Sequence, residues 1–240
     1  MAKPNHPLNP AIRLTDGRFY AADPHPHFTW MREHAPVYFD PEGNCWGIAL
    51  YEDVMLVAKD PETFCNREGM RPDSPPIPSM INMDDPAHKR RRNLVNKGFT
   101  PRRIAEHEAK VREICVELIE RARARRRFDF VGDVAAHLPM IMIGDMLGVA
   151  PEDRGTLLRW SDDMLRGTSL MAKPEVMEAA AQAFEEYAQY NRRVVADRRA
   201  KPPQDDLMSV LVYAEIDGER LDDEALLQES LLILIGGDET

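Results

Sequence analysis

The sequence of 240 residues has few cysteines and no apolar run of the length that a membrane protein needs. The longest apolar stretch, Leu231 to Ile235, is far shorter than the about 20 residues that span a bilayer. The first residues contain no apolar region typical of a signal peptide. The three cysteines, Cys45, Cys65 and Cys115, lack CxxC spacing and are too scattered for a disulfide framework. We therefore expect a soluble cytoplasmic protein with reduced cysteines and no membrane span.

Acidic residues outnumber basic ones overall, yet the basic residues are concentrated in one segment. The net charge of −10 argues against general binding of nucleic acid, and the basic residues are not interleaved with aromatic ones. Between Pro86 and Arg127, however, fourteen Lys or Arg residues stand against five Glu residues. This basic segment therefore needs an explanation other than nucleic acid.

Strand signals are confined to the front of the chain. The runs PVYFD (Pro36 to Asp40) and CWGIALY (Cys45 to Tyr51) are rich in β-prone residues and are separated by PEGN, which is typical of a hairpin turn. We expect a β-hairpin within residues 35–51. No period of 20 to 50 residues recurs. The rest of the chain has helical spacing of apolar residues, so the sequence predicts a mainly α protein.

Prolines mark where the helices begin. Asp85-Pro86 and Thr100-Pro101 each place a capping side chain before a proline, which predicts helices from these points, the first over 86–97. Pro174 opens a helix over 174–200 that is about 40 Å long at about 1.5 Å per residue. The final helix is expected over 222–240. A proline-rich loop over 70–84 cannot be regular helix, because proline lacks the backbone donor.

Two side chains of the helix over 86–97 can act together. His88 and Arg92 stand four residues apart, so they share a face and can meet a pair of anionic oxygens, such as those of a carboxylate or a phosphate. The alternative is that the basic residues form only a solvated helix face.

The last five residues, GGDET, form a second group of interest. Asp238 and Glu239 follow a wholly apolar run, and a buried acid is costly unless it has a task or a partner. Gly236 and Gly237 remove side chains where a bulky group could approach the backbone. The alternative is a helix end that turns into solvent.

Both groups resemble motifs of the bacterial cytochromes P450. The run from Asp85 to Arg102, Asp-Pro-x-His-x-x-x-Arg followed by Gly-Phe-Thr-Pro-Arg, is similar to helix C of that family, and GGDET is similar to the centre of helix I. The resemblance implies a mainly α P450 fold, with helices A to I and a small N-terminal β-hairpin. It also implies that residues 1–240 form the N-terminal part of a single domain.

The resemblance implies heme b, iron protoporphyrin IX, as the cofactor. His88 and Arg92 would bind a heme propionate, and Gly236 and Gly237 would lie against the heme and leave room for dioxygen. Glu239 and Thr240 would relay protons in catalysis. The metal ligand of this family is a cysteine in a Phe-x-x-Gly-x-x-x-Cys-x-Gly loop, which this chain lacks. The axial cysteine is therefore expected beyond residue 240, with the chain truncated before the heme-thiolate loop.

The loop over 70–84 resembles that of actinobacterial P450s that oxidise the terminal side-chain carbon of cholesterol or cholest-4-en-3-one. An apolar substrate would then be lined by residues of this loop and of the last helix, namely Ile77, Pro78, Met80, Ile233 and Leu234. A fatty-acid or terpenoid hydroxylase would need a similar lining, so composition leaves these substrates open.

The resemblance also implies partners, because such enzymes take two electrons from a ferredoxin, served by a ferredoxin reductase, and use dioxygen. The basic segment could attract an acidic ferredoxin, or it could be a solvated pair of helices. Both readings stay open for Arg90 and Arg91. The rival hypothesis from another class is a heme-free, non-catalytic fragment that acts as a binding module.

Overall fold

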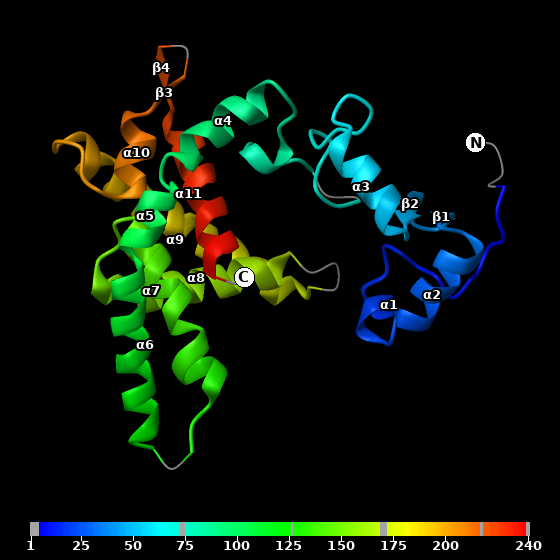
Figure 1. Ribbon diagram of the computed structural model, residues 1–240, viewed down its shortest axis with the longest axis horizontal. Helices are drawn as coiled ribbons and strands as arrows, with labels where there is room; N and C mark the ends of the chain where they lie inside the picture. Colours follow the sequence, from blue (N-terminus) through cyan, green and yellow to red (C-terminus); the bar gives the residue numbers. More distant parts are fainter. Residues whose placement is uncertain (1–4, 73–74, 126, 169–171, 217, 239–240) are drawn as a thin grey trace. The chain divides into compact units, whose positions relative to one another are not determined.

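The computed structural model describes residues 5–72, 75–125, 127–168, 172–216 and 218–238 (Figure 1). The chain divides into two compact units. The first contains the described residues up to 77 together with 81–85, and the second contains 78–80, 86–168 and 172–238.

The first unit contains the predicted hairpin. Strands β1 (Val37–Asp40) and β2 (Cys45–Ile48) pair antiparallel, and the Asp40 carboxylate organises their connection. It accepts hydrogen bonds from the backbone N–H groups of Glu42 at 3.0 Å and Gly43 at 3.1 Å, and from that of Leu14 at 2.7 Å. Around the hairpin lie the short helices α1 (Gly17–Ala21), α2 (His25–His34) and α3 (Tyr51–Lys59). The core of this unit is small, formed by Ile12, Phe19, Met31, Ala35 and Tyr38.

The second unit is built from helices, which confirms the mainly α prediction. Its longer elements pack around one core, in which α8 lies along α9 and α11 contacts α7, α8, α9 and α10. Their bounds in chain order are α4 (Ala87–Asn96), α5 (Pro101–Glu106), α6 (Glu108–Arg123), a π turn (Val131–Ala135), α7 (His137–Met146), α8 (Arg154–Gly167), α9 (Pro174–Arg199), α10 (Leu207–Tyr213) and α11 (Asp223–Asp238). Shorter pieces are the 3-10 turns Met80–Asn82 and Pro151–Asp153 and the two-residue strands β3 (Glu215–Ile216) and β4 (Glu219–Arg220).

The two helix starts predicted at Asp85-Pro86 and Thr100-Pro101 differ in how they are capped. Thr100 caps α5 as predicted, because its hydroxyl accepts a hydrogen bond from the backbone N–H of Arg103 at 3.4 Å. The N-cap of α4 is Pro86 rather than Asp85, and no side chain caps this end. The prediction that Asp85 is the cap was therefore wrong by one residue, because Pro86 occupies the cap position instead of the first helical position.

Helix α11 is apolar around its circumference, yet a buried polar network connects it to α9. Tyr187 donates a hydrogen bond to Ser230 Oγ at 2.9 Å, and the Asn191 amide donates another at 2.7 Å. Ser230 in turn donates to the Leu227 carbonyl at 2.9 Å. Burial raises the pKa of Tyr187. The phenol therefore stays protonated and keeps its role as a donor.

The segment after α7 turns sharply at Gly148 and is held by a buried arginine. Gly148 has φ of +70°, in the left-handed region that favours glycine. Arg198 donates to Asp206 Oδ2 at 2.9 Å, to Asp197 Oδ2 at 2.7 Å and to the Gly148 carbonyl at 3.4 Å. One guanidinium thus joins the end of α9 to the start of α10 and to this turn.

We expect Gly148→Ala to lower the free energy of unfolding by about 1 to 3 kcal/mol, because the left-handed backbone disfavours a side chain. The new Cβ would also overlap the Arg198 guanidinium. Gly155→Ala is the matched control, since Gly155 lies in α8 and no atom of the residues that the structure describes comes within 4 Å of the added Cβ. Urea unfolding should show Gly155→Ala to be neutral or stabilising, and equal effects of the two changes would contradict the expectation.

Glu186 of α9 accepts three side-chain hydrogen bonds, from Trp160 at 2.6 Å, Gln182 at 2.8 Å and Arg159 at 3.0 Å. These hydrogen bonds lower the pKa of Glu186 from 4.5 to about 2. The bond from the Trp160 indole has the largest effect, and those from Arg159 and Gln182 come next in size. A carboxyl with a lowered pKa stabilises the folded state above its unfolded pKa. This contribution is therefore complete well above pH 4.5 and is lost as the pH falls toward about 2.

The free energies of unfolding of wild type and Glu186→Gln should accordingly differ most near neutral pH and converge as the pH falls. Urea titrations followed by circular dichroism at a series of pH values measure this difference. Glu178→Gln, an exposed position of the same helix, is the control. A constant difference between wild type and Glu186→Gln across this range would contradict the assignment.

Candidate functional site

Helix α4 carries the predicted anion-binding pair. Leu94 and Val95 form its buried side, and α4 packs against α10. His88 is half-buried, whereas Arg92 is exposed. Among the described residues, no hydrogen bond or ion pair involves Arg92. Its charge is therefore available to an anionic group, which fits the propionate that the sequence resemblance implies.

The neighbouring Arg91 points into the unit. Its Nη1 lies 3.4 Å from Glu229 Oε1 of α11, and its side chain is 16% exposed. Arg90 is exposed. The sequence alone does not distinguish Arg90 from Arg91. In the structure they differ, because Arg91 pairs with a buried acid whereas Arg90 is exposed to solvent.

Glu229 is a buried acid near this site that the sequence analysis did not single out. It is fully buried, and its Oε1 accepts a hydrogen bond from the backbone N–H of Met80 at 2.9 Å. Among the described residues, its Oε2 has no hydrogen-bond partner. Burial raises the pKa of Glu229, while Arg91 and the Met80 N–H act in the opposite direction. The signal in the sequence is an acid next to the apolar run Leu231 to Ile235, within a helix otherwise predicted to be buried.

The glycines near the end of α11 differ in their surroundings. A Cβ added at Gly237 would overlap the side chain of Ile143, so this glycine is required where α11 meets α7. A Cβ added at Gly236 would meet no atom of the described residues within 4 Å. The open space beside Gly236 is what a heme lying against the helix would need. At Gly237, by contrast, the packing of α11 against Ile143 of α7 already explains the presence of a glycine.

Some of the other site residues predicted near the end of α11 lie outside the described residues. Glu239 and Thr240, the expected proton relay, lie beyond them. Ile233 is 8% exposed and Leu234 is fully buried, and both belong to the main core of the second unit. The side chains expected to line a substrate site from α11 thus contact other core residues.

The loop over 70–84 is held by amide and carboxylate side chains. Asn82 accepts from the Ile77 N–H at 3.0 Å and donates to the Asn66 carbonyl at 3.1 Å, and Asp84 accepts from the Asn66 N–H at 2.7 Å. Ile77 is exposed. These contacts are local to the first unit and fix the end of the loop that precedes α4.

The two remaining lining candidates of the loop belong to the second unit. Pro78 is exposed. Met80 is half-buried and packs against the core of this unit, while its backbone N–H is the group held by Glu229. The loop therefore reaches the buried acid of α11 through Met80.

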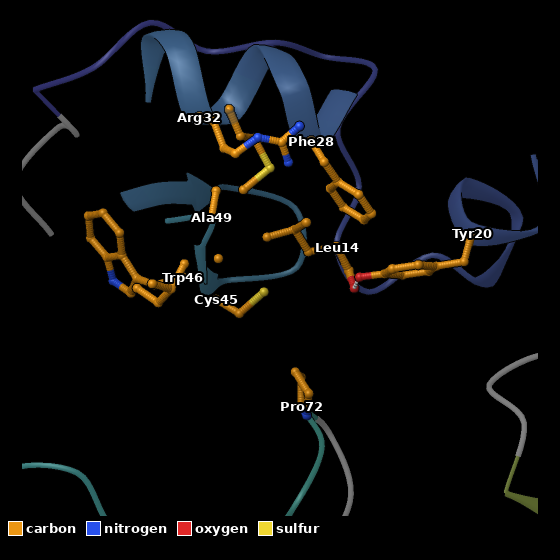
Figure 2. Close-up of a pocket in the computed structure, with 11 residues that line it drawn as sticks. Leu14, Tyr20, Phe28, Arg32, Cys45, Trp46, Ala49 and Pro72 are labelled. Carbon is orange, nitrogen blue, oxygen red and sulfur yellow. Dashed lines mark hydrogen bonds between the residues drawn. The ribbon is translucent and has the colours of Figure 1, made fainter. Parts of the chain in front are cut away.

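A separate cavity of about 490 Å³ lies in the first unit (Figure 2). Its walls are mainly apolar and come from α2, the hairpin and the segments around them, with Leu14, Phe28 and Trp46 among them. Arg32 is the one charged residue of the described lining. Tyr20 also lines the cavity, and its hydroxyl donates a hydrogen bond to the Leu14 carbonyl at 2.9 Å. None of the residues selected from the sequence contributes to this cavity.

Within the described ranges, no three His, Cys, Asp or Glu residues are grouped closely enough to hold a metal ion. No described helix is both long and apolar enough to cross a membrane. None of the three cysteines forms a disulfide with another described residue; Cys65 is exposed and the others are half-buried.

Comparison with known proteins gives relatives along nearly the whole chain. A steroid C26-monooxygenase of Mycobacterium tuberculosis is 48% identical over 232 residues, which cover 96% of this chain and 58% of that protein. A steroid C26-monooxygenase of Mycolicibacterium smegmatis is 43% identical over 232 residues, which cover 96% of this chain and 57% of that protein. The chain thus spans somewhat more than half the length of these curated relatives.

The fold has neighbours among solved structures as well. The cytochrome P450 CYP268A2 of Mycobacterium marinum, solved in complex with pseudoionone, matches with a TM-score of 0.84 and 26% identity. The match covers 96% of this chain and 61% of that one. No protein-family model matches the sequence.

The glycine pair gives a prediction. Gly236→Ala should raise the stability of the protein without heme by up to about 1 kcal/mol, because Ala is the better helix former and space is open. Gly237→Ala should lower it, because Ile143 must move. Thermal unfolding of both variants measures the difference, and each serves as the control for the other. Equal destabilisation would show that the space beside Gly236 is filled.

Proposed function

Because the chain belongs to the cytochrome P450 family, we propose that the complete protein is a heme-thiolate monooxygenase. Its proposed reaction is hydroxylation of the terminal side-chain carbon of a sterol, cholesterol or cholest-4-en-3-one. The observation that carries this proposal is the 48% identity to a steroid C26-monooxygenase along 96% of the chain. The activity is proposed for the complete protein because the chain spans 58% of that relative.

The residues of α4 and α11 would bind the cofactor, heme b. The exposed Arg92 and its neighbour His88 would pair with a propionate, since a guanidinium binds a carboxylate by charge and by directed hydrogen bonds. Gly236 would let the porphyrin approach the helix, because no atom of the described part of the chain fills the space beside it. When bound, heme supplies the chemistry of dioxygen activation.

Proton delivery is proposed for Glu239 and Thr240, the carboxyl and hydroxyl that follow α11 in the sequence. A carboxyl can hold a proton and pass it through a hydroxyl within hydrogen-bond reach. The thiolate ligand is not assigned to Cys45, Cys65 or Cys115, since none has the surroundings of that ligand loop.

The substrate site is proposed to include the loop residues Ile77, Pro78 and Met80, together with Ile233 and Leu234 of α11. The exposure of Ile77 and Pro78 supports the loop half of this proposal. Leu234 is fully buried, so its role would be to pack behind the residues that line the substrate site. A fatty acid or a terpenoid remains the second candidate substrate, because an apolar lining suits any of these molecules.

Electrons are proposed to come from a ferredoxin, reduced by a ferredoxin reductase, in the cytoplasm. Arg90 supports a docking role because it is exposed at the surface of α4. Arg91 contributes less, since it is 16% exposed and paired with Glu229.

The test of the proposed function uses the complete gene product that contains this chain. We expect a reduced carbon monoxide complex with a thiolate-type absorption band, and a spectral shift on titration with cholest-4-en-3-one. A shift with a fatty acid or a terpenoid but not with the sterol would reject the sterol assignment. Absence of any heme band would reject the monooxygenase and favour the heme-free binding module.

The propionate assignment has its own prediction. Arg92→Gln should speed the loss of heme to an excess of apomyoglobin by about tenfold, because a charge-assisted hydrogen bond is worth about 1.5 to 3 kcal/mol. Arg112→Gln, at an exposed position of α6, is the charge-matched control. The assignment would be wrong if both variants lost heme at the wild-type rate.

A further inference from the structure

Glu229 of α11 contacts two segments that both lie far before it in the sequence, the loop at Met80 and helix α4 at Arg91. Its Oε1 lies 3.4 Å from Arg91 Nη1 of α4 and accepts the hydrogen bond of the Met80 N–H at 2.9 Å. Met80 and Arg91 precede Glu229 by 149 and 138 residues. A single carboxylate oxygen of α11 is thus the point where the loop and the basic helix meet.

A carboxyl group at this position is costly as a packing element alone. The side chain is fully buried, and among the described residues its second oxygen has no hydrogen-bond partner. Well-packed apolar side chains often stabilise a protein more than a buried ion pair of similar size does. What Glu229 supplies, and a leucine could not, is a directed attachment to two neighbouring segments.

The attachment of α11 to the rest of the core does not depend on Glu229. Ser230, the next residue, is bound by Tyr187 and Asn191 of α9. Successive residues of a helix point about 100° apart, so the two contacts act on different sides of α11. Ser230 therefore connects α11 to the core, and Glu229 is left to hold the loop and α4.

We propose that Glu229 is a positioning residue that sets α4 through Arg91 and the substrate loop through the Met80 amide. This inference rests on the proposed function, since Arg92 follows Arg91 directly on α4. A shift of Arg91 displaces the proposed propionate ligand. The two attachments use different donors, a side chain and a backbone amide, so substitutions can separate them.

Four variants of the complete protein test the proposal. Glu229→Gln removes the charge that holds Arg91 but keeps an oxygen for the Met80 N–H. Arg91→Gln removes the other member of the pair, and the double variant combines both. Glu229→Ala removes both attachments. Two readouts follow them, the rate of heme loss to apomyoglobin and the hydrogen–deuterium exchange of the Met80 amide.

We expect Glu229→Gln and Arg91→Gln each to speed heme loss by about tenfold, within the range of coupled neighbours. The double variant should add nothing further, because either change already breaks the pair. Exchange of the Met80 amide should become faster in Glu229→Ala and stay near wild type in Glu229→Gln and Arg91→Gln.

Three matched controls separate positioning from general destabilisation. Glu224→Gln makes the same change at an exposed position of α11. Ser79→Ala changes a buried loop hydroxyl that has no hydrogen-bond partner among the described residues. Tyr187→Phe removes one of the two hydrogen bonds from α9 to Ser230 and leaves that of Asn191, so it should lower the thermal midpoint without changing the rate of heme loss.

Wild-type rates of heme loss in both single variants would overturn the proposal, as would strictly additive effects in the double variant. Heme loss that follows the thermal midpoint, with Tyr187→Phe included, would show a structural role only. If the wild-type protein binds no heme, the proposed function fails. The exchange of the Met80 amide still tests the loop attachment in that case.

Discussion

A helix that is apolar on every side can rotate and slide among its neighbours unless a few polar groups fix it. In α11 these groups are the consecutive residues Glu229 and Ser230, both fully buried. Ser230 is bound by the two donors from α9, and Glu229 by the donors from α4 and the loop. Dispersion and burial favour many placements of such a helix, whereas directed hydrogen bonds favour one. The geometry of the candidate site depends on this constraint.

The rest of the second unit supports that helix through packing. Helices α8 and α9 form the most extensive pair, and Trp160 and Tyr187 contact each other at their interface with ring centroids 6.3 Å apart. Leu226 and Leu234 of α11 are fully buried in the same core. Burying an aliphatic side chain of this size contributes about 1.5 to 3 kcal/mol. Many apolar contacts therefore contribute to the stability of the second unit, whereas a few hydrogen bonds fix the orientation of α11.

Much of this architecture could be predicted because its signals are local. Periodicity predicted the helices, the PEGN turn predicted the hairpin, and Thr100 before Pro101 predicted a cap. The prediction of Asp85 as the N-cap of α4 was wrong by one residue. Pro86 occupies the cap position instead, and no side chain caps this end of the helix. The pair Arg91 and Glu229 could not be predicted, since its members are 138 residues apart and only the packed fold brings them together. The cavity near Arg32 is likewise a product of tertiary structure.

The contact between Glu229 and the loop goes to the main chain of Met80 and not to its side chain. Any residue except proline offers the same N–H group, so the hydrogen bond itself requires no particular side chain at position 80. The side chain of Met80, which packs against the core of the second unit, has no part in this anchor. Under the proposed function, the side chains of the loop could then change the fit to a substrate while the hydrogen bond that anchors the loop stays in place.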